Sequence, residues 1–351
     1  MPSEPAEELA RELRDLQRRV DKLHSRVRLT DVQDSAEDVG TIASGLLQRI
    51  QAVRARGYVF ESWLEETARD LESQWPRLRE SVVKQIEQEA AALGRELPAV
   101  ESLLRQVEAR ADRPSDAEPV LERADRATEV LEEKARAAAD HISGMYDQFE
   151  DEVNELTGHL HQVEWMLTEL AQASFQLLPV EAPIMAVRAT WDQSQNQRPQ
   201  GLLYLTDQRL LFEQKQEIAT KKVLFIATEK EKVQQLLFEV PVGQIEKVVA
   251  SHKGLLGHED HLDLAFASDA PRPAAHFHID GQRSETWQEL IGRATSGDFD
   301  RDRAVPLDQE AIETVRSAPT RCPACSAPIT QRILRGMDRI RCEYCGHVIR
   351  L

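Results

Sequence analysis

Apolar and polar residues alternate with a helical period in the first segment of the chain. The apolar positions are separated alternately by four and three residues: Leu9, Leu13, Leu16, Val20, Leu23 and Val27. This spacing is the a/d repeat of a coiled coil, but an amphipathic helix of a bundle shows the same pattern over three heptads. We therefore predict a helix with a narrow apolar seam and leave both packing modes open.

Two further helical stretches follow. The pair Asp34-Ser35 is a candidate N-cap for a second helix, which we predict to reach about residue 74. Proline is tolerated in a first turn, so Pro76 is expected to begin a third helix that ends near residue 111. The polar run at 112–116 interrupts the pattern, and we expect Pro119 to begin the next helix.

The fourth stretch is the longest, and its heptad-like spacing runs from Leu131 to Leu170. Two four-residue intervals meet at Phe149, which in a coiled coil would be a stutter. Roughly 40 residues with this repeat predict a helix about 60 Å long. Such a helix cannot bury its seam alone. It must fold onto the preceding helices or pair with a second copy, which makes a homo-oligomer one expectation.

After Pro179 the pattern changes to short runs rich in β-branched and aromatic residues, separated by turn signals. We predict strands at 184–191, 201–205, 209–213, 223–227, 236–240, 245–250, 262–267 and 275–279. A helix is predicted at 284–294, with Trp287, Leu290 and Ile291 on one face. The sequence thus predicts a small antiparallel barrel or sandwich closed by a terminal helix.

Two motifs in this segment resemble a known family. The run GLLYLTDQRLLF at 201–212 resembles the second and third strands of GRAM and bacterial PH-like domains, and VPVGQIEKV at 240–248 resembles their later strand. The resemblance covers residues 182–296. It implies a PH-like antiparallel β-barrel with a capping helix. In that family the domain is a platform that binds lipid headgroups or protein segments and is not an enzyme.

All four cysteines lie near the C-terminus, as Cys322, Cys325, Cys342 and Cys345. Their spacing, C-x2-C-x16-C-x2-C, is typical of a tetrahedral four-thiolate Zn²⁺ site. Four protein ligands leave no position for water, so we predict one structural zinc ion per chain. The segment also resembles the zinc ribbons that are appended to many bacterial proteins.

The expected ribbon is small. Gly346 follows the second cysteine pair, where a residue without Cβ lets the backbone turn, whereas Ser326 stands at the corresponding place after the first pair. Such a short unit has too little core to fold without its metal. The candidate apolar positions are Ile329, Ile333, Leu334, Ile340, Val348 and Ile349.

Charge limits the partners of the chain. The net charge is −17, of which residues 1–180 carry −15, residues 181–300 carry −5 and the tail carries +3. Such an acidic surface disfavours wrapping of duplex DNA or broad contact with an anionic membrane. The tail could contact phosphate, but docking onto acidic helices of its own chain or onto another protein is favoured. Its basic residues are Arg321, Arg332, Arg335, Arg339, Arg341 and Arg350.

Two other groups of residues are candidates for ligand binding. The pairs His258/His261 and His276/His278 suggest a second metal, but the first pair lacks the i, i+4 spacing of the H-E-x-x-H motif. We favour loop and surface histidines. The lysines that flank the predicted strand at 223–227 could meet an anionic headgroup, although neighbouring glutamates favour a solvated strand end. These lysines are Lys221, Lys222, Lys230 and Lys232.

We find no phosphate-binding loop, dinucleotide fingerprint or nucleophile turn, and we assign no catalytic residues and no organic cofactor. The N-terminus is acidic without the apolar region of a signal peptide, and no apolar run approaches 18 residues. Clustered thiolate ligands also require a reducing compartment. We therefore expect a non-enzymatic, cytoplasmic protein.

We predict a multidomain organisation with a helical or coiled-coil region at 1–178, a GRAM/PH-like β-domain at 182–297, a linker at 298–319 and a zinc ribbon at 320–351. The favoured function is a scaffold or adaptor that binds protein partners through the β-domain and the ribbon. The alternatives are a peripheral membrane adaptor that binds anionic lipid headgroups, and a nucleic-acid-associated factor that acts through the basic ribbon.

Overall fold

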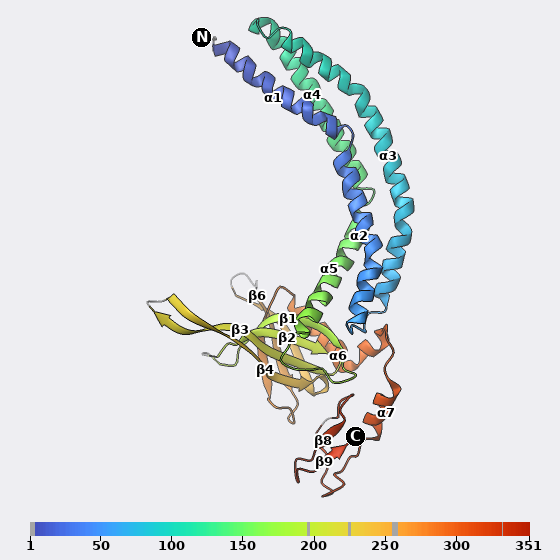
Figure 1. Ribbon diagram of the computed structural model, residues 1–351, viewed down its shortest axis with the longest axis vertical. Helices are drawn as coiled ribbons and strands as arrows, with labels where there is room; N and C mark the ends of the chain where they lie inside the picture. The colour runs from blue at the N-terminus through green and yellow to red at the C-terminus, as the bar shows by residue number, and fades with distance from the viewer. Residues whose placement is uncertain (1–3, 195–196, 224–225, 255–258, 332) are drawn as a thin grey trace. The chain divides into compact units, whose positions relative to one another are not determined.

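The chain forms two compact units in the computed structural model, which describes residues 4–351 except 195–196, 224–225, 255–258 and 332, without the side chains of 4–6, 217–231 and 311. The first unit comprises Met1–Gln48 and Glu66–Gly158. The second comprises Arg49–Glu65 and His159–Leu351. The helices are α1 (Glu4–Arg26), α2 (Thr30–Ala55), α3 (Trp63–Glu108), α4 (Pro114–Ser143) and α5 (Asp147–Leu170) (Figure 1).

The second and third helices begin and end at other residues than predicted. Helix α2 begins at Thr30, before the expected cap at Asp34, and α3 continues through Pro76 as one curved helix (Figure 1). Trp75 stacks on Phe149 with ring centroids 5.5 Å apart, and this packing supports the backbone beside Pro76. Tertiary contact thus overrides the local tendency of proline to end a helix.

The prediction of one long helix over residues 131–170 is wrong, because α4 ends at Ser143 and α5 begins only at Asp147. The break falls next to the predicted stutter at Phe149. It brings Tyr146 to a buried position, 3% exposed, while the expected seam residue Met145 is half-buried. A shift in the heptad register was therefore a genuine signal of irregular backbone.

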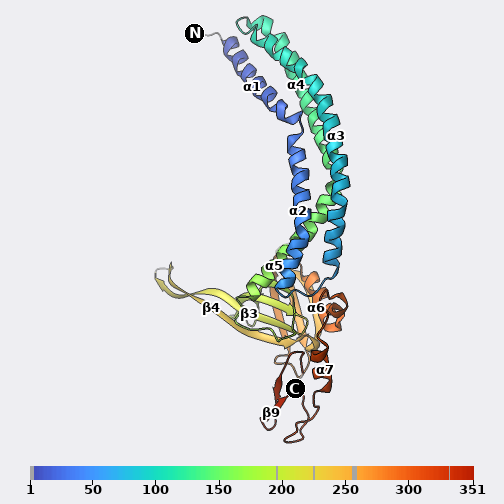
Figure 2. The ribbon, with the colours of Figure 1, turned by 45° about the vertical axis from the view of Figure 1, so that its right-hand side comes forward.

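The apolar seam is closed within one chain. Leu16, Val20 and Leu23 on α1 are at most 3% exposed. Helices α1 and α4 lie side by side in both ribbon views (Figures 1 and 2). This is bundle packing; pairing between two chains stays a prediction. None of the described helices combines the length and the apolar composition needed to cross a lipid bilayer.

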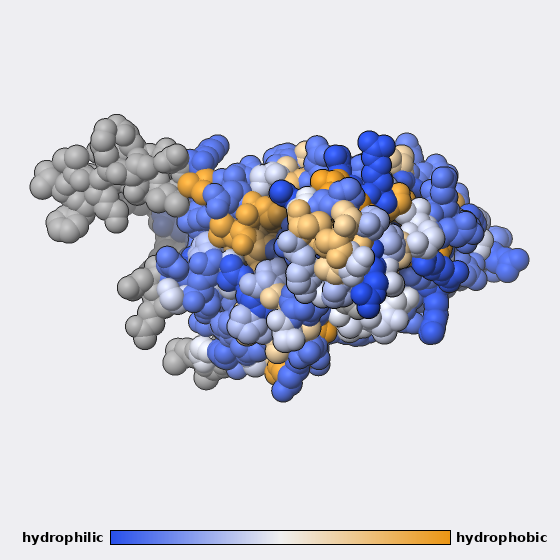
Figure 3. All heavy atoms as spheres, turned by 90° about the horizontal axis from the view of Figure 1, so that it is seen from below, coloured by the Kyte–Doolittle hydropathy of each residue, from blue (hydrophilic) through white to orange (hydrophobic). Residues whose placement is uncertain are grey.

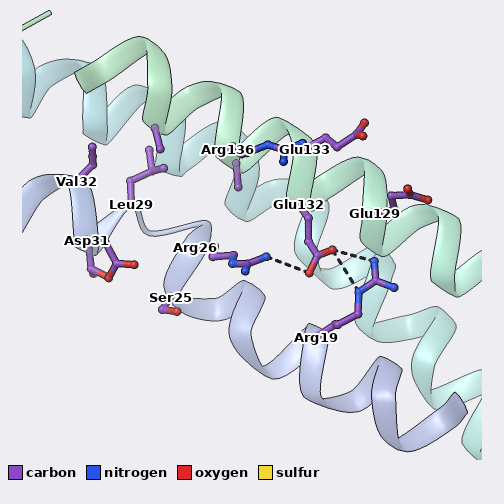
Figure 4. A pocket seen from close by; sticks show the side chains of 13 residues that line it. Arg19, Ser25, Arg26, Leu29, Asp31, Val32, Glu129, Glu132, Glu133 and Arg136 are labelled. Carbon is purple, nitrogen blue, oxygen red and sulfur yellow. Dashed lines mark hydrogen bonds and ion pairs between the residues drawn. The ribbon is translucent and has the colours of Figure 1, made fainter. Parts of the chain in front are cut away.

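A cavity of about 480 Å³ lies where α1 and α2 meet α4, and its walls carry charges of both signs. Glu132 accepts hydrogen bonds from Arg19 at 2.8 Å and from Arg26 at 3.1 Å (Figure 4). These charges compensate one another across the helix pair. We therefore interpret the cavity as a polar, water-accessible gap between helices and not as a ligand site.

Gly40 lies in close contact with Trp75, because a Cβ added there would overlap the Trp75 indole at Cε2. We expect Gly40→Ala to destabilise the protein by about 1–3 kcal/mol, since the overlap forces either the indole or the helix to move. Gly45 on the same helix provides a matched control, because a Cβ added there would meet no atom within 4 Å.

For Gly45→Ala we expect about 1 kcal/mol of stabilisation, because alanine restricts the unfolded chain and favours the helix. Denaturant unfolding of both variants measures the difference. Equal effects of the two substitutions would show that α2 does not pack on Trp75.

The sheet of the second unit has seven antiparallel strands in the order β4-β3-β2-β1-β7-β6-β5. The strands are β1 (Pro183–Trp191), β2 (Gln200–Thr206), β3 (Arg209–Val223), β4 (Ile226–Pro241), β5 (Ile245–Lys253), β6 (Glu259–Phe266) and β7 (Ala274–Asp280). Helix α6 (Ser284–Ser296) follows, with Trp287 and Ile291 fully buried. The predicted antiparallel domain with a following helix is confirmed; the narrower assignment to GRAM domains stays a prediction.

Aromatic side chains show that the sheet folds over itself. Trp191 on β1 lies 5.8 Å from Phe212 on β3, 5.5 Å from Phe238 on β4 and 6.0 Å from Phe277 on β7, measured between ring centroids. Phe238 also lies 5.5 Å from Phe266 on β6. Residues from both halves of the sheet therefore share one core.

The predicted strand at 223–227 is wrong, because Val223 ends β3 and Ile226 begins β4. Strand β3 pairs with β2 only as far as Gln214, and beyond this point β3 and β4 extend as a two-stranded hairpin (Figures 1 and 2). Most of the hairpin between Gln214 and Gln235 is polar or charged, so only the apolar run at 223–227 gave a strand signal, and that run joins β3 to β4. The side chains of Lys221, Lys222 and Lys230 lie outside the described residues.

The segment predicted as a linker contains a 3-10 turn, η3 (Asp298–Asp302), and helix α7 (Gln309–Ser317). Phe299 is 2% exposed and its ring lies 5.4 Å from that of Phe60, which precedes α3. The Arg303 guanidinium lies 4.7 Å from the centre of the Phe60 ring. The chain after α6 therefore packs on the α2–α3 connection.

Candidate metal centre

The C-terminal cysteines lie on two knuckles beside a short hairpin of β8 (Arg339–Arg341) and β9 (Val348–Arg350). In the first knuckle the Ser326 N–H donates to the Cys322 carbonyl at 2.8 Å, and in the second the Gly346 N–H donates to the Cys342 carbonyl at 2.8 Å. Ser326 and Gly346 have φ values of 60° and 72°. Both knuckles thus need a left-handed residue at the same position, which glycine adopts without steric cost.

The four sulfur atoms are arranged for one metal ion. Cys322 Sγ lies 3.7 Å from Cys345 Sγ, and Cys325 Sγ lies 3.7 Å from Cys342 Sγ. All four sulfurs lie within 4.8 Å of one another. Four thiolates bound to Zn²⁺ at about 2.3 Å in a tetrahedron are about 3.8 Å apart, so the observed separations fit this ion. They exceed the sulfur–sulfur bond of a disulfide, about 2.05 Å.

The local electrostatics favour ionisation of the Cys322 sulfur but not of the Cys325 sulfur. A backbone hydrogen bond from Ala327 lowers the pKa of Cys325, but hydrogen bonds with the neighbouring cysteine sulfurs and burial outweigh it and raise that pKa to about 12. Burial raises the pKa of the Cys322 thiol, but hydrogen bonds from the backbone N–H groups of Cys325 and Ala324 outweigh it and lower that pKa to about 7. A thiol that ionises near neutral pH supplies the thiolate that a metal ion requires.

The ribbon has a minimal core. Ile340 and Ile349 face each other across β8 and β9 and are at most 4% exposed. The prediction that Val348 belongs to this core is wrong, because it is 51% exposed on the opposite face of its strand. The partly buried residues that complete the core are Ile329, Ile333, Met337 and Leu351.

Met337 and Leu351 were missed by the sequence reasoning. An isolated methionine and a terminal leucine follow no apolar period, so only the fold of the loops could place them. This core contains few large side chains, which agrees with the expectation that a metal must supply most of the stability of the ribbon.

Arg335 attaches the ribbon to the β-domain. It pairs with Asp207 at 2.7 Å and with Asp300 at 3.3 Å, and its carbonyl accepts a hydrogen bond from Gln208 Nε2 at 3.1 Å. Arg303 forms a further ion pair with Asp207. Within the second unit, the ribbon therefore docks on the β2–β3 turn and on η3.

Asp207 is the centre of this contact, and its side chain is 3% exposed. Burial raises the pKa of the Asp207 carboxyl to about 6, although the Ala182 N–H and the guanidinium groups of Arg335 and Arg303 act in the opposite direction. The cost of removing the carboxylate from water is thus only partly offset by its two cationic partners.

Three other arginines of the tail, Arg321, Arg339 and Arg341, have local partners. Arg321 donates to the Ser326 carbonyl at 3.1 Å, and Arg341 donates to the Gly346 carbonyl at 3.3 Å, so both support the knuckles. Arg339 is exposed and pairs with Asp338 at 3.2 Å. Arg332 lies outside the described residues. The basic tail therefore presents fewer arginine side chains that are available to bind phosphate than its sequence suggests.

The interpretation of the histidines as surface residues is wrong for His261, which is 5% exposed. His276 and His278 lie on one face of β7, and Phe277 between them is buried on the other. The rings of His276 and His278 lie 5.0 Å and 4.9 Å from that of His261. His258 lies outside the described residues.

No protein-family model matches the chain, and comparison with curated proteins gives no match. Among solved structures, the DH/PH domains of p115-RhoGEF are similar at 13% identity over 84% of this chain and 95% of that chain, with a TM-score of 0.22. The DH/PH fragment of PDZRHOGEF in complex with human RhoA is similar at 14% identity over 84% and 96% of the two chains, with a TM-score of 0.24. Scores this low do not establish a common fold and carry no argument about function.

Proposed function

We propose that this protein is a non-enzymatic scaffold whose C-terminal ribbon, folded around one structural Zn²⁺, binds protein partners together with the β-domain. The supporting observation is the clustering of the sulfurs of Cys322, Cys325, Cys342 and Cys345 within 4.8 Å of one another. Four cysteine ligands fill the tetrahedron and leave no open position for a substrate or an activated water. The zinc ion is therefore proposed to hold the fold of the ribbon and its binding surface and to take no part in catalysis.

The exposed side chains of the ribbon favour a protein as the partner. Tyr344, which lies between the second pair of cysteines, is 66% exposed, and Val348 on β9 is 51% exposed. Apolar side chains also gather among hydrophilic ones on the face drawn in Figure 3. Exposed tyrosine beside aliphatic and arginine side chains is typical of protein interfaces, where tyrosine and arginine are enriched.

Phosphate recognition is less well supported. Arg335, the arginine best placed to anchor the ribbon, already pairs with two carboxylates of its own chain. Binding of nucleic acid would have to rely on exposed residues such as Arg339. A lipid-binding β-domain remains an alternative that depends on lysines whose side chains lie outside the described residues.

The test compares the full-length protein with Tyr344→Ala and with Val130→Ala, a control on α4 where Val130 is 49% exposed and lies outside both proposed binding domains. Cross-linked partners are identified by mass spectrometry, purified and titrated directly. We expect Tyr344→Ala to weaken direct binding about tenfold or more, as for a truncated aromatic anchor, while Val130→Ala leaves it unchanged. Both variants should keep one zinc per chain.

The competing functions are tested on the same proteins. Flotation with anionic but not neutral liposomes would favour the membrane adaptor. Salt-dependent binding of nucleic acid that is lost in Arg339→Glu would favour the nucleic-acid factor. Either result, in the absence of a protein partner sensitive to Tyr344→Ala, would overturn the proposed scaffold.

A further inference from the structure

Strands β6 and β7 bring imidazole and carboxylate groups together on one face of the sheet. His261 and His278 are direct cross-strand partners, as are Asp263 and His276. Because side chains on a strand alternate between faces, Glu259 shares a face with His261, and His276 shares one with His278. Leu262 and Phe277, which lie between these residues on the two strands, are fully buried on the opposite face. Five ligand-forming side chains therefore converge outside that core.

A series of hydrogen bonds runs from the Asp263 carboxylate through the His276 ring to the His261 ring. Asp263 Oδ1 lies 2.5 Å from His276 Nδ1, and His276 Nε2 lies 3.0 Å from His261 Nδ1. The side chain of His261 is only 6% exposed, so its remaining nitrogen has little access to water. Carboxylate–histidine arrangements of this kind orient metal-binding imidazoles in proteins.

If His261 and His276 are both neutral, their two N–H groups cannot supply a donor between His261 Nε2 and the Glu259 carboxylate. A neutral imidazole carries one N–H. If His276 donates its Nδ1–H to Asp263, its Nε2 must accept the Nδ1–H of His261. His261 Nε2 is then a bare lone pair, and it lies 3.4 Å from Glu259 Oε2. Two facing acceptors at this distance need a cation between them or beside them.

We propose that Glu259, His261 and His278 bind a divalent transition-metal ion of the zinc type, separate from the four-cysteine centre. One ligand atom from each of the three side chains lies within 4.8 Å of the others. Metal–ligand bonds of about 2.0–2.2 Å require these atoms to move slightly closer together. Rotation of the exposed Glu259 side chain and of the His261 and His278 rings permits this movement. Imidazole with carboxylate suits zinc, nickel and copper better than calcium or magnesium.

His276 and Asp263 act as positioning residues in this site, because they hold the His261 ring and its tautomer without contacting the metal. With three protein ligands the ion keeps at least one open position. The site is therefore expected to exchange its metal more readily than the closed ribbon, where four thiolates surround the ion.

The test titrates the full-length protein, with its ribbon zinc in place, with Zn²⁺ in isothermal calorimetry and with Co²⁺ in absorption spectroscopy. We expect one further metal per chain, and the added Co²⁺ should lack the sulfur-to-metal charge-transfer absorption of a thiolate site. The substitutions Glu259→Gln and His278→Gln should each weaken this binding at least tenfold while the ribbon zinc is retained. The side chain of Glu259 is 53% exposed, so its replacement should not disturb the fold.

His252→Gln is the discriminating control, because His252 forms a separate cluster with Asp260 and Glu285. It should leave the second metal unchanged. Failure of the wild-type protein to bind a further ion would overturn the proposal and indicate that a proton occupies the site. Loss of the further ion in His252→Gln, with Glu259→Gln unaffected, would equally overturn it.

Discussion

Replacing Cys322 with serine should abolish zinc binding by the four-cysteine centre and unfold the ribbon at 320–351. The variant removes one of four clustered thiolates, and the remaining core centres on Ile340 and Ile349. Structural zinc contributes about 10–16 kcal/mol to the folding of such small units, which is far more than two isoleucines can provide. We therefore expect this substitution to have the largest effect of any single change in the ribbon.

Zinc content by atomic emission and limited proteolysis at 320–351 measure this result. Ser326→Gly provides the matched control in the same knuckle, because glycine accepts the left-handed conformation that Ser326 adopts at φ 60°. The control should keep its zinc and its protease resistance. A Cys322→Ser protein whose tail resists protease as well as the wild type does would show that the ribbon folds without metal.

Asp207→Ala should destabilise the second unit by about 3 kcal/mol, because it removes the common partner of two buried guanidinium groups. Both Arg303 and Arg335 keep a contact with Asp300, which places the expected effect at the lower end of the range for broken buried ion pairs. The ribbon should also lose its attachment to the β2–β3 turn and become more accessible to protease.

Denaturant unfolding at pH 8 measures the change in unfolding free energy, since the Asp207 carboxyl is ionised well above its pKa of about 6. Asp269→Ala, at an exposed turn of the same unit, is the control and should change stability by less than about 0.5 kcal/mol. Equal stability of the two variants would mean that the ion pairs of Asp207 contribute nothing to docking of the ribbon.

The strands of the core were predictable because each carries buried apolar residues between turn signals. The run at 184–191 and the run at 275–279 lie within β1 and β7, and the predicted helix at 284–294 lies within α6. The β3–β4 hairpin was not predictable by the same rule. Its arms beyond Gln214 are mostly polar or charged, and the apolar run at 223–227 gave a strand signal where β3 ends and β4 begins.

The helix boundaries failed for a different reason. Pro76 is a strong local signal, yet Trp75 and its partner Phe149 are far apart in sequence and hold α3 together. The break between α4 and α5 had a signal in the heptad stutter. The predicted helix continued through that stutter, although the stutter accompanies a full interruption of the helix.

The sequence by itself determined the helical and antiparallel segments and the four cysteines whose spacing predicts a metal site. These are properties of local period and of fixed ligand spacing, which survive any arrangement of the remaining chain. Only the tertiary structure decided that the heptad seam closes within one chain and that Arg335 pairs with Asp207. It also decided that His261 lies buried between His276 and His278. Each of these contacts joins residues distant in sequence, and their energies depend on burial and strand register that no local pattern encodes.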